Sequence, residues 1–169
     1  ADLSGRGLAF AGMPLGQLRL AVSRGDTLGA PITRLNAALE GTNSRLSAQG
    51  HIFKDSLPDL GLQLAGFDVS PFQPLLRSYL GEFRGRLDGQ VRVGGSLSSP
   101  SLEGFLQTNG LTFLPVQNGV RYRLPSEKFL FEKNKMVFQS VRLVDEKKKK
   151  TTLTGHIDLL DPANPRADL

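Results

Sequence analysis

The chain has 169 residues, which is enough for one domain with a hydrophobic core. Its formal charge of +5 comes from one segment, because residues 121–150 hold ten basic and four acidic side chains while the rest is nearly balanced. The absence of cysteine excludes disulfide bonds, a thiolate nucleophile and a cysteine-ligated metal site.

Short segments in the first third of the chain alternate apolar and polar residues. They fall within residues 16–22, 35–39, 45–52 and 60–64, with polar turn-forming residues between them. A period of two is typical of a β-strand with one apolar face, and the regular spacing is typical of an antiparallel meander. We therefore expect consecutive antiparallel strands in this part of the chain.

One segment, Pro71–Phe83, has the pattern of a helix. Ser70 suits the N-cap, proline suits the first helical position, and Gly81 would end the helix. We expect a short helix that plugs one end of a sheet, and the alternative is a lid or gate over an apolar channel. The expected apolar face consists of Leu75, Leu76, Tyr79 and Leu80.

The alternating pattern is clearest between Leu87 and Leu114. Two alternating runs are separated by Ser98–Ser101, where Pro100 cannot donate to a strand ladder, so we expect a hairpin. Alternation resumes after residue 120, with turns expected at Glu132–Lys135 and Asp145–Lys150. The C-terminal third is therefore predicted to be a second β region.

The order and spacing of these motifs resemble the C-terminal region of the TamB family, a group of AsmA-like proteins. The hairpin carries most of the resemblance, in residues 94–106, GGSLSSPSLEGFL. The flanking segments contribute GFDVSPF at 66–72, GVRY at 119–122 and LTGHI at 153–157. The similar region extends over residues 35–160.

The resemblance implies an envelope protein that joins the inner and outer membranes through a long β-sheet trough with an apolar interior. It implies an Omp85-type outer-membrane barrel protein, TamA, as partner, and either phospholipid or unfolded outer-membrane protein as cargo. It also implies a periplasmic location, with the full-length protein anchored in the inner membrane by an N-terminal segment outside this fragment.

We therefore predict an all-β fold: a curved antiparallel β-sheet trough (β-taco) with one short helix. Residues 1–169 would form a single β-rich fragment of a larger protein. Glycines on the apolar face would let the sheet curl, and that face would form either an open groove or a closed core. The predicted groove residues are Leu18, Leu20, Val22, Leu46, Ile52, Leu62, Leu64, Leu87, Val91, Val93, Leu97, Leu102, Leu106, Met136, Phe138, Val141, Leu143, Leu153, Ile157 and Leu159.

Three functions fit this face. Phospholipid transport to the outer membrane needs a continuous apolar lining. Assembly of outer-membrane β-barrel proteins or autotransporters needs unpaired strand edges that can template another strand. A passive adhesin or spacer needs neither. We predict no enzyme, no catalytic residue, no cofactor and no metal site, because His51 and His156 both fall on polar strand faces and nothing singles out a nucleophile.

The lysine run Lys147–Lys150 is expected at a hairpin tip. It could be a solvated guard of a sheet edge, or it could contact anionic lipid headgroups. A nucleic-acid role is not predicted, because no aromatic residue interleaves with the lysines to stack on bases.

Overall fold

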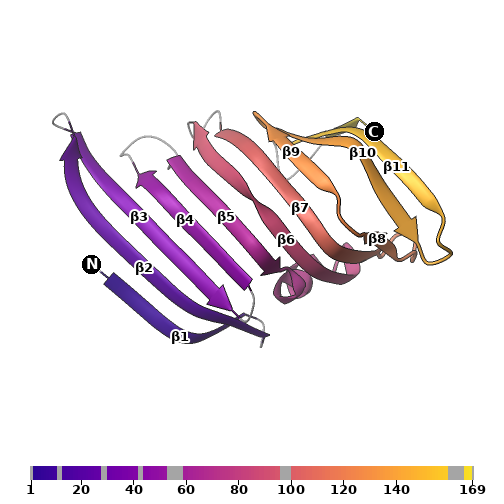
Figure 1. Cartoon of the computed structure of the whole chain (residues 1–169), viewed down its shortest axis with the longest axis horizontal. Coiled ribbons are helices and arrows are strands. Elements are labelled where there is room, and N and C mark those ends of the chain that lie inside the picture. The colour runs from indigo at the N-terminus through magenta and orange to yellow at the C-terminus, as the bar shows by residue number, and fades with distance from the viewer. Residues whose placement is uncertain are drawn as a thin grey trace.

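The computed structural model describes residues 2–10, 13–27, 30–41, 44–52, 59–95, 100–159 and 166–168. The described residues form one 12-stranded antiparallel sheet with a short helical segment near its middle (Figure 1). The predicted all-β fold, a curved antiparallel sheet with one short helix, is therefore confirmed.

The first half of the sheet is a simple meander in which each strand pairs with the next. All its strands except the first contain a predicted alternating segment, because a half-buried pleated surface suits a period of two. The first strand was not predicted. The strands of this half are β1 (Asp2–Phe10), β2 (Met13–Thr27), β3 (Ala30–Gly41), β4 (Ser44–Ile52), β5 (Asp59–Asp68) and β6 (Leu80–Gly95).

The second half branches at β7. This long strand pairs with β6 along one edge, and with both β8 and β9 along the other. Strands β8 and β9 both pair with β10. Strand β10 also pairs with β11, and β11 pairs with β12. The strands are β7 (Pro100–Pro115), β8 (Tyr122–Leu124), β9 (Lys128–Glu132), β10 (Lys135–Asp145), β11 (Lys150–Asp158) and β12 (Arg166–Asp168).

The helical segment is shorter than predicted. It consists of a 3-10 turn, η1 (Ser70–Phe72), and a single α-turn, α1 (Gln73–Leu76). The predicted helix end at Gly81 is wrong, because β6 has already begun at Leu80 and its residues take ladder partners on β7. The predicted cap is also wrong, since Val69 holds the N-cap position and Ser70 instead donates its backbone N–H to Asp68 Oδ1 at 2.9 Å.

The predicted apolar face of that helix is likewise wrong as a single buried face. Leu75 is 62% exposed and Tyr79 is 67% exposed, while Leu76 and Leu80 are half-buried. A single α-turn is too short to bury four residues on one side. The segment instead leaves two large apolar side chains at the surface.

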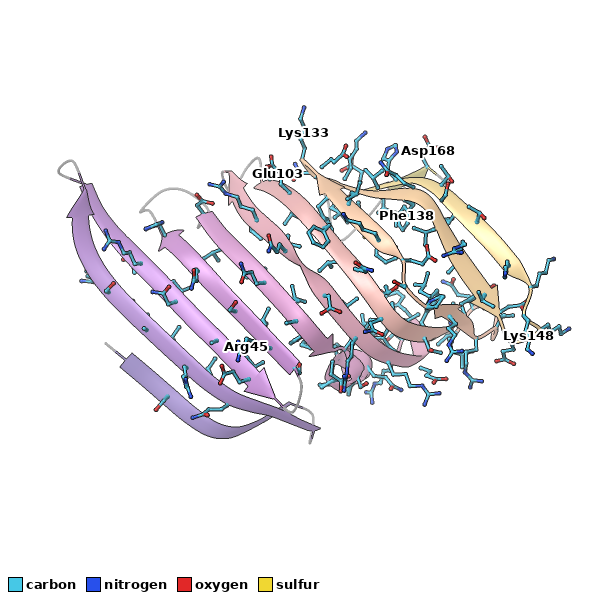
Figure 2. All side chains as sticks on the ribbon, viewed as in Figure 1. Arg45, Glu103, Lys133, Phe138, Lys148 and Asp168 are labelled. Atoms are coloured by element: carbon cyan, nitrogen blue, oxygen red, sulfur yellow. The ribbon has the colours of Figure 1, made fainter. Side chains whose placement is uncertain are left out.

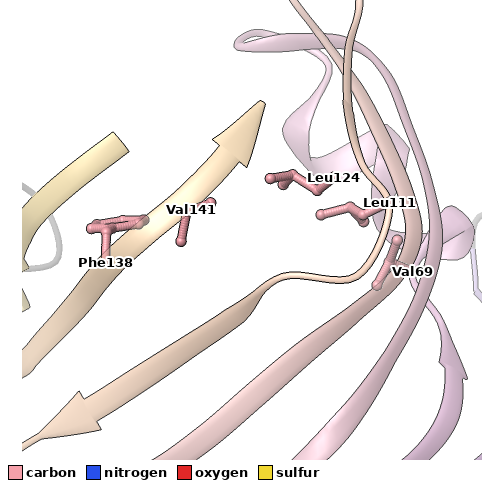
Figure 3. Packing of buried hydrophobic residues seen from close by; sticks show 5 residues of the cluster. All are labelled: Val69, Leu111, Leu124, Phe138 and Val141. Atoms are coloured by element: carbon pink, nitrogen blue, oxygen red, sulfur yellow. The ribbon is translucent and has the colours of Figure 1, made fainter. Parts of the chain in front are cut away.

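The hydrophobic core lies where the sheet curls over, at its C-terminal end (Figure 3). Phe138 and Val141 of β10 belong to the same buried cluster as Leu111 of β7, Leu124 of β8 and Val69, and Val141 is only 1% exposed. Register shifts between Phe138 and Val141, next to Ser140 with φ 61°, mark a bulge in β10. The bulge lets two residues three positions apart face the same core.

A buried polar contact completes this end. Thr108 of β7 donates its backbone N–H to the Glu127 carbonyl at 2.8 Å, and its hydroxyl accepts the Glu127 N–H at 2.8 Å. The Glu127 carboxylate accepts a hydrogen bond from Arg142 Nε at 3.1 Å. These bonds satisfy polar groups that would otherwise be costly to bury.

Among the described segments, no helix has the length and apolar character needed to cross a membrane.

Candidate functional site: an open apolar sheet face

Cross-strand registers align the apolar residues into rows that cross the whole sheet. Residues in register on neighbouring strands lie on the same face, so each row is a strip of adjacent side chains. The central row contains Leu20, Ala37, Ala48, Leu62, Val91, Gly104, Phe131, Met136 and Ile157.

Two further rows flank the central one. They are made by the same alternation, two residues to either side along each strand, and they contain only apolar residues and glycine. One contains Val22, Leu35, Gly50, Leu60, Val93 and Leu102, and the other contains Leu18, Leu39, Leu46, Leu64, Gly89, Leu106, Phe129, Phe138 and Gly155.

The apolar face is open in the N-terminal half. Among residues 16–66 whose side chains are described, none is buried, and the apolar ones are at most half-buried. Strands β2–β5 form a single layer, and the described helical segment approaches this layer only where η1 contacts β2 (Figure 1). The apolar side chains of these strands therefore meet solvent in the absence of a ligand.

The same face is closed in the C-terminal half. There the curl of β8–β11 brings the two arms of the sheet together over the core cluster. Figure 2 shows the side chains gathered around Phe138 at this end of the sheet. The alternatives of an open groove and a closed core thus describe two ends of one sheet.

The predicted groove residues divide between these two ends. Leu97 and the side chain of Ile52 lie outside the described residues. In the closed end, Phe138 and Val141 are buried, and their half-buried neighbours are Leu87, Met136, Leu143, Leu153 and Ile157. In the open end and at the boundary, half-buried residues on the apolar face are Leu18, Leu20, Val22, Leu46, Leu62, Leu64, Val93, Leu102 and Leu106.

Two predicted residues lie at borders of this surface. Val91 is buried, at the point where the open and closed parts of the central row meet. Leu159 lies half-buried just beyond β11, and its N–H donates to the Asn134 carbonyl at 2.7 Å.

Several apolar-face residues were missing from the predicted set. In the open part these are Leu35, Leu39 and Leu60, which follow the same alternation as the residues that were chosen. In the closed part, Leu111 and Leu124 lie in the core cluster and Phe113 packs against it. The signal that could have found Leu111 and Phe113 is their own alternation, in the strand that follows the hairpin.

The opposite face is polar and bears an exposed charge pair. Arg92 of β6 donates from Nε and Nη2 to the two carboxylate oxygens of Asp59 on β5, at 2.8 and 2.7 Å. These hydrogen bonds hold the pKa of the Asp59 carboxyl below its ordinary value. They also raise the pKa of Arg92, so the pair stays charged.

Shallow hollows of about 380 Å³ and about 520 Å³ lie over β2–β4 and over β4–β7. Polar-face side chains such as Ser47, Gln49 and Gln63 line them, together with residues of the central row such as Leu20 and Leu62. His51 is exposed and His156 is half-buried, both in polar-face positions. Within the described part of the chain, no group of three His, Asp or Glu side chains could hold a metal ion.

Comparisons of the chain with family models, with curated proteins and with solved structures find no match. The likeness to the TamB family stays a prediction from the motifs.

Proposed function

We propose that this chain shields apolar cargo, above all phospholipid acyl chains, on the open apolar face of β2–β6. The observation that carries the proposal is that three continuous apolar rows cross strands that have no covering layer. Contiguous exposed apolar surface of this kind is a mark of interaction with lipid or protein.

The dimensions and composition of the face suit an acyl chain. Neighbouring strands lie about 4.8 Å apart, so a row from β2 to β6 is about 20 Å long. One leaflet of a bilayer has about 15 Å of hydrocarbon, so an extended acyl chain fits along a row. Each buried methylene contributes about 0.8 kcal/mol, which makes an aliphatic lining sufficient without specific polar contacts.

The resemblance to the TamB family adds the setting. If the chain belongs there, the cargo would be phospholipid moving through the periplasm toward the outer membrane, with an Omp85-type barrel protein as partner. The apolar rows would accept cargo at the open N-terminal end of the sheet, and the packed core at the C-terminal end would keep cargo out of the rest of each row.

A second candidate is assembly of outer-membrane β-barrel proteins. The observation that favours it is the position of β1 at the end of the strand order, where it pairs with β2 alone among the described strands. An unpaired strand edge can accept another strand. Crosslinks from β1 to a barrel precursor would support this function, and their absence alongside bound lipid would support transport.

The deciding experiment is native mass spectrometry of the purified chain for bound phospholipid. We expect Leu62→Asp to remain folded and to lose most of the lipid, because a carboxylate would interrupt the central row. The matched control is Gln63→Asp, the next residue of β5 on the polar face, which should keep its lipid. Absence of lipid from the wild type, or equal loss from both variants, would contradict the proposal.

A further inference from the structure

One edge of the molecule combines exposed apolar side chains with lysines that form no ion pair among the described residues, and we call it the helix edge. It comprises Leu75 of α1, Tyr79 just after α1, Val116 just after β7, and Lys147–Lys150 at the β10–β11 turn. Leu75, Tyr79 and Val116 are 62%, 67% and 55% exposed. The Val116 N–H donates to the Tyr79 carbonyl at 2.9 Å, so these two residues are neighbours.

Ion pairs link the lysine turn to β6, the strand that follows the helical segment. Arg121 Nε lies 2.7 Å from Glu82 Oε2 on β6, and its Nη1 lies 3.3 Å from Glu146 Oε1 in the β10–β11 turn. Glu82 follows Tyr79 by three residues, and Glu146 directly precedes Lys147. Figure 1 shows the helix below the middle of the sheet, and Figure 2 shows Lys148 at the lower right end.

A basic row runs along the polar face at this edge. Arg84, Thr112, Arg123, Val144 and Lys150 are consecutive cross-strand neighbours on β6, β7, β8, β10 and β11. Several of them line a hollow of about 440 Å³, together with Arg121 and Lys148 and with the acidic residues Asp145 and Glu146. Among the described residues, no carboxylate pairs with Arg123 or with Lys147–Lys150.

We propose that the helix edge docks onto the surface of an anionic phospholipid bilayer. Tyrosine favours the membrane–water interface, where its ring and its hydroxyl meet suitable surroundings, and Leu75 and Val116 would enter beside it. Each lysine near an anionic surface adds about 1 kcal/mol of attraction. Arg123 and Lys148 line the hollow without a carboxylate partner among the described residues, so they can contact a lipid phosphate.

A bilayer fits this edge better than a nucleic acid does. A nucleic acid would neutralise the lysines but would leave Leu75 and Val116 exposed to water, and no described aromatic residue lies within the lysine turn. The inference concerns a different surface from the apolar rows and does not depend on the cargo proposed above. Tested on protein stripped of bound lipid, it can fail or succeed independently of that proposal.

The test is co-sedimentation with vesicles of phosphatidylglycerol and phosphatidylcholine. The double variant Lys147→Ser with Lys149→Ser should bind about thirtyfold more weakly, because it loses two attractions of about 1 kcal/mol each. The matched control is Lys133→Ser with Lys135→Ser, which removes the same charge from the β9–β10 turn, labelled at the top of Figure 2 by Lys133. The control should bind almost as well as the wild type.

Insertion of the apolar residues is tested separately by fluorescence. The chain contains no tryptophan, so Val116→Trp supplies a single reporter at the helix edge. Its emission should shift to the blue with anionic vesicles and stay unchanged with phosphatidylcholine alone. A reporter at the other end, Lys133→Trp, should not shift. Equal weakening by both lysine pairs, binding to neutral vesicles alone, or binding to a single-stranded oligonucleotide but not to vesicles would overturn the proposal.

Discussion

Glycines on the apolar face bring neighbouring strands close together at particular points. Gly104 has φ +131°, and a Cβ on it would lie 2.1 Å from the Gln90 carbonyl oxygen of β6. Because the obstruction is backbone, it cannot rotate away as a side chain could. Gly104 therefore has a backbone conformation that favours glycine, and the space beside its Cα has room for a hydrogen atom but not for a Cβ.

We therefore expect Gly104→Ala to lower the free energy of unfolding by about 1–3 kcal/mol or more, the usual cost of a non-glycine residue in a disfavoured backbone region. Gly61→Ala is the matched control, since its Cβ would meet only the Gln49 carbonyl oxygen, at 3.7 Å. Urea denaturation of both variants measures the difference. If they were equally stable, the strands would not need glycine at position 104.

The Asp59–Arg92 pair gives a pH-dependent prediction. The pKa of Asp59 is lowered in the folded protein by its hydrogen bonds to Arg92, so the pair stabilises the fold above the unfolded pKa of about 3.9. This stabilisation is lost as the pH falls through the folded pKa.

We expect Arg92→Gln to raise the pKa of Asp59 toward its ordinary value in an NMR titration of the carboxyl carbon. The difference in thermal stability between wild type and variant should be small, because both groups are exposed, and should disappear in acid. A stability difference that persisted well below pH 3 would show that Arg92 acts through packing and not through Asp59.

At the scale of elements, the strands were predictable because alternation alone specifies which face each residue takes. The β10–β11 hairpin and its lysine tip are confirmed, as is the pairing of the two long strands β6 and β7. The helix was predicted to be too long because the sequence pattern around Leu80 and Phe83 is compatible with both a helix and a strand. Their ladder partners Pro115 and Phe113 decide between the two, and they are distant in the chain.

The closure of the C-terminal end could not be predicted from periodicity. It depends on the bulge at Ser140 and on the branch of β7 to two partners, β8 and β9, which no local pattern encodes. The buried Thr108–Glu127 contact was missed for the same reason, since it joins residues 19 positions apart. Local alternation therefore located the apolar surface without showing which part of it is covered.

A pair of substitutions distinguishes the two parts. Val141→Asp places a carboxylate among the buried core residues of β10 and should cost several kcal/mol, enough to unfold the domain. Leu62→Asp lies on half-buried β5, where the carboxylate can reach water, and should remain folded with a smaller loss. Circular dichroism with thermal melting measures both. If Leu62→Asp also unfolded, the face of β5 would be covered in solution.

At the scale of the whole molecule, stability is expected to be graded along the sheet. In the C-terminal half, side chains from several strands pack against one another in a buried core. The described side chains of β2–β5 form no such core, and these strands are held mainly by the hydrogen bonds between neighbouring strands. Regions with few buried apolar contacts open locally at lower free energy than the core. The part of the sheet proposed to take cargo is therefore also the part that opens most easily.

Hydrogen exchange followed by mass spectrometry should reveal this gradient. In protein stripped of lipid, amides of β2–β5 should exchange well before those of β7 and β10, whose residues Leu111, Phe138 and Val141 form the core. Adding phospholipid should slow exchange in β2–β5, because a bound ligand protects against every opening that disrupts its binding site, and the local openings of these strands would disrupt it. Exchange that was uniform in the stripped protein would mean that the apolar rows are already covered. If the exchange gradient were present but lipid did not change it, the face would be open as described and the lipid would bind elsewhere.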